Sequence, residues 1–197
     1  MVLSVIEIAI FLMLPLILFY QRSTWEAKRY IPVLVVLYLI WYVTYALMHE
    51  LSHLFGVWIM GKDLQGYQLL PKFWKGEFGY GVVHYNFVGD RADFWIILMP
   101  YLRDVLLCII GFLLVRRRIG ASVFVTGLIL VLLVFSPLFD VANNFGVYLL
   151  YSINDFNALS VASSRLTAHV IGASFFLFTL FLSVWVLQVS RGYPQRV

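Results

Sequence analysis

Five long apolar runs dominate this 197-residue chain and restrict it to folds that lie in a membrane. Hydrophobic residues make up 62% of the chain and charged residues 12%, with a mean hydropathy of +0.91. In soluble domains about a quarter of the residues are charged. The runs cover residues 2–20, 31–60, 94–115, 121–150 and 165–190. About 20 helical residues cross the hydrocarbon core of a bilayer, so we predict an all-α polytopic membrane protein with about five transmembrane helices.

The chain is too short for a separate soluble module, so we expect a single membrane-embedded domain over residues 1–197 with its core at 31–150. The first run lacks a small-residue cleavage site and is expected to stay as a span. The lone cysteine, Cys108, lies in an apolar run and is expected to be a small core residue.

The formal charge of +4 comes from basic residues beside the apolar runs, so no nucleic-acid partner is expected. An orientation with the N-terminus outside and the C-terminus in the cytoplasm places most of them on the cytoplasmic side. These residues are Arg22, Lys28, Arg29, Arg116, Arg117, Arg118, Arg191 and Arg196. We therefore expect a multi-pass protein of a prokaryotic plasma (inner) membrane.

The sequence HELSH, residues 49–53, lies inside the second apolar run. His49 and His53 are four residues apart, so on a helix both imidazoles reach one metal ion. Glu50 is offset from them, where its carboxylate can hold a water molecule at that ion. Ionisable groups inside a membrane span are costly and usually functional, so the pattern predicts zinc-dependent hydrolysis within the bilayer.

Asp140, in the fourth run, is the expected third ligand. It lies about as deep in its run as His49 does in the second, and the two runs point the same way at ~1.5 Å of rise per residue. Asn143 and Asn144 share its helical face, and Pro137 precedes it. Two further possibilities stay open: a structural Asp140 paired with Arg103, or a ligand drawn from elsewhere. The residues considered for that last role are Glu77, His84 and His169.

The loop at residues 61–93 is long and aromatic. Val83, Tyr85 and Phe87 alternate with polar residues, which predicts a β-hairpin at the membrane interface that turns near residues 74–79. It serves either as an interfacial anchor or as a strand edge that holds a substrate segment in extended form. Arg103 and Asp104, in the third run, are expected at the depth of HELSH as a local pair.

These motifs resemble the site-2 protease family of intramembrane zinc metalloproteases. His49, Glu50 and His53 match its HExxH motif, and Pro137 and Asp140 match the proline and aspartate of its second motif. Phe139 and Val141 stand where the family has Leu and Gly, and PDZ and CBS modules are absent, as in a divergent minimal member. The resemblance implies a three-helix core, a zinc cofactor and cleavage of membrane-protein substrates.

We therefore expect one Zn²⁺ per chain on His49, His53 and Asp140, with Glu50 as general base. Asn143, Asn144 and Tyr85 are candidate substrate-binding residues. The expected partners are the bilayer and the transmembrane segment of a substrate, with a regulatory membrane partner or a homo-oligomer also open. The competing function is a noncatalytic chaperone or adaptor that grips transmembrane segments; the sequence offers only three convincing ligands, whereas structural zinc normally has four.

Overall fold

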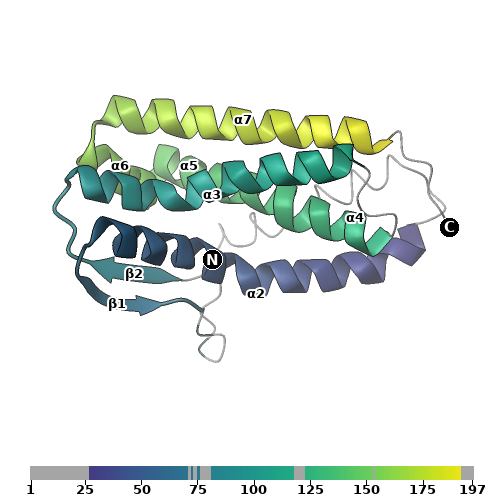
Figure 1. Cartoon of the computed structure of the whole chain (residues 1–197), viewed down its shortest axis with the longest axis horizontal. Helices are drawn as coiled ribbons and strands as arrows, with labels where there is room; N and C mark the ends of the chain where they lie inside the picture. Colours follow the sequence, from purple (N-terminus) through teal and green to yellow (C-terminus); the bar gives the residue numbers. More distant parts are fainter. Residues whose placement is uncertain are drawn as a thin grey trace.

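The computed structural model describes residues 27–70, 72, 75, 81–117, 123–152 and 154–191, and these are mostly helical. Figure 1 shows long helices side by side with a small hairpin beside one end of α2. The elements are α2 (Ala27–Met60), β1 (Leu64–Gln68), β2 (Val82–Tyr85), α3 (Arg91–Arg116), α4 (Val123–Leu130), the π-helical turn η2 (Val131–Phe135), α5 (Ser136–Tyr151), α6 (Asp155–Ala162) and α7 (Arg165–Arg191).

Four helical segments of the described chain are long and apolar enough to cross a membrane. They are Val35–Met60, Arg91–Arg116, Gly127–Tyr151 and Arg165–Val186. They correspond to the last four apolar runs, so these four predicted spans are helices of membrane-crossing length and composition. The run at residues 2–20 lies outside the described residues.

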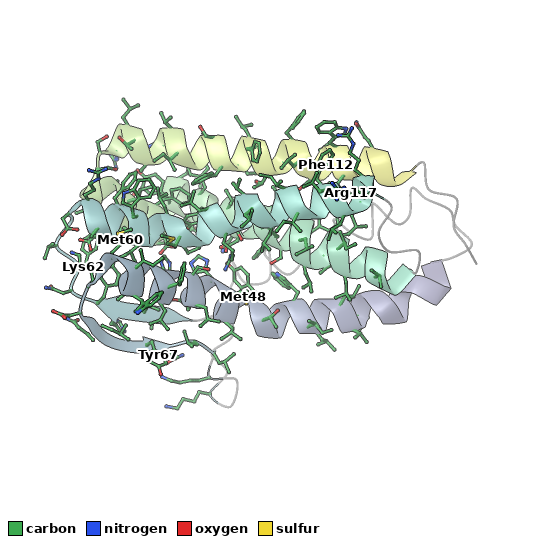
Figure 2. All side chains as sticks on the ribbon, viewed as in Figure 1. Met48, Met60, Lys62, Tyr67, Phe112 and Arg117 are labelled. Atoms are coloured by element: carbon green, nitrogen blue, oxygen red, sulfur yellow. The ribbon has the colours of Figure 1, made fainter. Side chains whose placement is uncertain are left out.

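Helix α3 lies at the centre of the molecule, where it packs against α2, α5, α6 and α7. One buried cluster joins α3 to its neighbours through Tyr101, Val141, Phe156 and Ala168. Toward the other end of α3, where Figure 2 labels Phe112, the ring centroids of Phe112 and of Trp185 on α7 are 4.6 Å apart. The side chains that face this central helix therefore come from most of the other elements.

The predicted β-hairpin is confirmed. Strands β1 and β2 pair antiparallel, with Gly66 opposite His84 and Tyr67 opposite Val83. The predicted turn near residues 74–79 lies, except for Lys75, outside the described residues. The hairpin follows α2 directly and β2 packs against that helix, so the sheet lies beside the helix that carries HELSH.

The fourth apolar run is one span with a widened turn in its middle. Pro137 has no N–H to donate to the carbonyl four residues earlier. The turn that carries that carbonyl, η2, is π-helical, and α5 begins directly after it. Such widened turns often accompany functional sites because they redirect the side chains that follow. The helix that follows this turn, α5, carries Asp140.

Candidate metal centre

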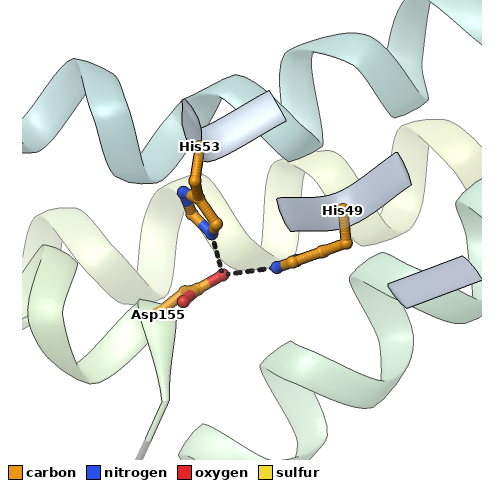
Figure 3. Close-up of side chains that lie close together, drawn as sticks. All are labelled: His49, His53 and Asp155. Atoms are coloured by element: carbon orange, nitrogen blue, oxygen red, sulfur yellow. Dashed lines mark hydrogen bonds and ion pairs between the residues drawn. The ribbon is translucent and has the colours of Figure 1, made fainter. Parts of the chain in front are cut away.

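Two histidines of α2 and one aspartate of α6 converge at the centre of the candidate site (Figure 3). His49 and His53 lie one helical turn apart and are each 8% exposed. The Nε2 atom of each lies 3.1 Å from the same carboxylate oxygen, Oδ2 of Asp155. The prediction that both imidazoles reach one point is confirmed.

Asp155 reaches this point because the chain reverses direction after α5. Ser152 adopts a left-handed conformation, and its N–H donates to the carbonyl of Tyr148. Asn154 also has a positive φ and caps α6 by accepting from the N–H of Phe156. Asp155 thus occupies the first turn of α6, where the exposed N–H groups of a helix favour a negative charge.

The other ring nitrogen of each histidine fixes its tautomer. His53 Nδ1 lies 3.0 Å from the carbonyl oxygen of Ile96, which can only accept, so Nδ1 carries the hydrogen. His49 Nδ1 lies 2.8 Å from Oδ2 of Asp140, a carboxylate that also accepts from other donors. When both imidazoles are neutral, neither Nε2 atom carries a hydrogen. The Nε2 lone pairs of His49 and His53 then point toward Asp155.

Two lone pairs and a carboxylate oxygen at 3.1 Å repel one another unless a proton or a cation lies between them. Two ligands of a tetrahedral zinc ion, each bonded at about 2.0–2.1 Å, lie about 3.3 Å apart. The set of two nitrogens and one oxygen therefore fits a divalent metal such as zinc, and it leaves a fourth position open, as in catalytic zinc sites.

Asp155 is held in place by a third contact. The hydroxyl of Tyr101, a fully buried residue of α3, donates to its Oδ2 at 2.8 Å. Burial by itself raises the pKa of the Asp155 carboxyl, but the charge and hydrogen bonds of His53 and His49, when these rings are protonated, outweigh burial and hold this pKa well below its usual range.

Asp140, the expected third ligand, lies on the far side of the His49 ring. Its carboxylate accepts from Nδ1 of His49, from Arg103 at 2.8 Å, from Asn144 at 2.8 Å and from Tyr45 at 3.2 Å. The prediction that Asp140 lies at the same depth in the bundle as His49 is thus confirmed. Asp140 does not, however, belong to the group of potential metal-ligand atoms in the described chain, which contains Asp155 instead. Asp140 orients the His49 ring from behind, in the position that outer carboxylates take beside histidine ligands at many metal sites.

Arg103 connects this carboxylate to α3. It bonds Asp104 at 2.6 Å, Asp140 at 2.8 Å and, from α2, the hydroxyl of Ser52 at 3.1 Å. The expected local pair with Asp104 is therefore present, and so is the pairing of Arg103 with Asp140. Both carboxylates are 1% exposed, so one guanidinium balances two buried acids.

Glu50 lies against the hairpin. It is 8% exposed, and a Cβ atom added to Gly81 would lie 3.0 Å from its Oε1 and closer still to its Cγ. The absence of a side chain at Gly81 lets the start of β2 pass directly over the Glu50 carboxylate. The Glu50 carboxylate is thus enclosed between its own helix and the backbone beside β2.

The remaining predicted residues are distributed around the site. The side-chain amide of Asn144 donates to the carbonyl and to the carboxylate of Asp140, and Asn143, one position before Asn144, is half-buried. Tyr85, at the end of β2, is half-buried, and burial together with Asp93 raises its pKa. His169 bonds Tyr148 and the Arg165 carbonyl, away from the histidine pair.

His84 does not contribute a third ligand. It is an exposed residue of β2 opposite Gly66, and the ligand group of the described chain does not contain it. Glu77 lies outside the described residues. The substrate-binding role of Asn143, Asn144 and Tyr85 stays a prediction.

Asp155 and Tyr101 were missed by sequence reasoning. Asp155 follows the fourth apolar run in a short polar stretch, and its only local signal is the helix-capping pair Asn154 and Asp155. Tyr101 sits in an apolar run where a tyrosine has no distinguishing pattern. A buried tyrosine does need a partner for its hydroxyl, which gives the physical reason for its contact.

Comparisons with protein-family models, with curated proteins and with solved structures found no match to this chain.

Proposed function

We propose that this protein is an intramembrane zinc metalloprotease that hydrolyses peptide bonds in or near the transmembrane segments of other proteins. One observation carries the proposal: the Nε2 atoms of two histidines and one carboxylate converge in a bundle of membrane-length helices, with Glu50 next in sequence to the first histidine. A noncatalytic site has no need of that additional buried carboxylate.

His49, His53 and Asp155 would hold the ion. Zinc in such a site supplies a Lewis acid that activates a water molecule and polarises a carbonyl. Glu50 accepts the proton of the attacking water and returns it to the leaving nitrogen. The site is buried on three sides by α2, α3 and α6, while the Asp155 side chain keeps 25% exposure, which leaves water a route. Asp140 and Tyr101 hold His49 and Asp155 in position throughout.

The hairpin supplies a means to present the substrate. A helical substrate hides its peptide bonds in its own hydrogen bonds, so it must become extended before water can attack. Within the described residues, each of the two strands has one edge without a strand neighbour, and an extended segment can add to such an edge. Because β2 begins one residue after Gly81, a segment paired near its start would pass close to Glu50.

The test uses the full chain purified in detergent. We would measure zinc by elemental mass spectrometry and incubate the protein with a set of synthetic single-span peptides, identifying the products by mass spectrometry. We expect about one zinc per chain in the wild type, retained zinc but no cleavage in Glu50→Gln, and wild-type behaviour in Asp63→Asn, an exposed control carboxylate.

Cleavage by Glu50→Gln would overturn the mechanism. A wild type that takes up no zinc when zinc is supplied would overturn the metal centre. Zinc binding without any cleavage, in which chelation only lowers thermal stability, would favour the noncatalytic chaperone or adaptor.

A further inference from the structure

Pro100 lies inside α3, one turn after Ile96, and is buried. In an α-helix the N–H of residue 100 would donate to the carbonyl of residue 96. Proline has no N–H, and its ring pushes the carbonyl four residues earlier away from the helix axis. The carbonyl of Ile96 therefore lacks its helical donor and is free to accept from outside α3.

That carbonyl meets a ligand of the candidate metal centre. Nδ1 of His53 donates to it at 3.0 Å, and the bond is buried. This bond sets the tautomer of His53 and directs its Nε2 lone pair toward Asp155. The hydrogen bond that α3 loses at Pro100 is replaced by one to the metal centre.

The two helices come close enough for this bond because of Gly56, one turn after His53 on α2. A Cβ atom at Gly56 would lie 3.0 Å from the Cα of Ile96 and 3.0 Å from Cγ of Met99. The backbone of α2 thus packs directly against the turn of α3 that carries the Ile96 carbonyl. A larger residue at position 56 would separate His53 from Ile96.

We propose that Pro100 is a positioning residue of the metal centre, which acts by leaving the Ile96 carbonyl available to orient His53. The inference rests on the metal site of the proposed function. It predicts that any residue with an N–H at position 100 returns a competing donor to this carbonyl. His53 then loses part of its hydrogen bond and orients less well.

The test compares wild type with Pro100→Ala, both full-length in detergent. Zinc affinity is measured by competition with a chromophoric chelator, and thermal stability is measured on the metal-free proteins. Loss of an outer-shell partner typically weakens metal binding about 10- to 100-fold; we expect about 10-fold here because a carbonyl can accept two bonds. Stability should stay equal or rise, since alanine favours a helix interior and proline opposes it.

Leu102→Ala is the control, because Leu102 lies on the same helix and is 38% exposed. It should leave zinc affinity unchanged. In addition, ¹⁵N NMR of the metal-free imidazoles should show a changed Nδ1 environment for His53 in Pro100→Ala and an unchanged one for His49.

Weaker zinc affinity together with equal or higher stability would support the positioning role. Zinc binding by Pro100→Ala with wild-type affinity would overturn it, as would a joint fall of affinity and stability, which indicates a merely structural proline. A wild type that binds no zinc would overturn the metal centre itself and this inference with it.

Discussion

At the scale of single residues, two aspartates flank His49 with different consequences. Asp155 faces Nε2 and Asp140 faces Nδ1. We expect Asp155→Asn to abolish zinc binding, because it removes a charged ligand, and Asp140→Asn to weaken it about 10- to 100-fold while the ligand set stays the same. Chelator competition gives the affinities, and the absorption spectrum of the cobalt-substituted protein reports the ligand set.

The reverse order would contradict this assignment. A spectrum altered by Asp140→Asn and unaltered by Asp155→Asn would make Asp140 the ligand, as the sequence motif suggested.

Gly81 leaves room for the side chain of Glu50. A methyl group there would collide with Glu50, so Gly81→Ala should displace the base while leaving the metal ligands in place. A misplacement of about 1 Å can lower a rate by about 10²-fold, and we expect a loss of peptide cleavage of that order with normal zinc content. Gly66→Ala is the matched control, because its added Cβ would meet nothing within 4 Å. Equal activities of the two variants would show that Gly81 does not position Glu50.

At the scale of elements, Lys62 ties the end of α2 to the start of α3 through ion pairs, and it and its partner Asp90 lie outside the spans. Lys62 bonds Asp90 at 2.8 Å and Asp93 at 3.1 Å. The hydrogen bond from Lys62 lowers the pKa of Asp90, and the bond to Asp90 raises the pKa of Lys62. Asp90 thus contributes stability above its unfolded pKa of about 3.9 and loses it as pH falls through its lower folded pKa.

Lys62 behaves in the opposite sense. Its contribution is complete below its unfolded pKa of about 10.4 and is lost as pH rises through its higher folded pKa. Lys62→Met should therefore lower the thermal midpoint slightly and by a constant amount between about pH 5 and pH 9, and the difference should shrink at more acidic pH. Thermal unfolding of both proteins across this range checks the prediction. A difference that grows on acidification would contradict it.

At the scale of the whole molecule, Lys62 and the hairpin residue Tyr67 lie at one end of the bundle and Arg117 at the other (Figure 2). The positive-inside rule predicts that the hairpin faces outward. In intact cells a membrane-impermeant maleimide should label Tyr67→Cys and spare Arg117→Cys until the membrane is opened. The native Cys108 is fully buried and should stay unlabelled. Labelling of only Arg117→Cys in intact cells would reverse the orientation.

Local sequence patterns predict the helical class of the structure and two of the three residues of the candidate ligand group. Apolar runs of about 20 residues specify membrane helices, and the i, i+4 spacing of His49 and His53 specifies a shared helical face, because both depend on local geometry alone. The alternation around Tyr85 likewise predicted the hairpin.

The packing of the helices determines which aspartate joins His49 and His53 in the candidate ligand group. Asp140 and Asp155 both approach His49, and only the reversal at Ser152 and Asn154 places Asp155 at the Nε2 atoms, leaving Asp140 behind the ring. The same holds for the Ile96 carbonyl, which becomes a partner of His53 only where α2 and α3 touch. Contacts between residues distant in sequence depend on how helices pack and turn, and no local spacing encodes them.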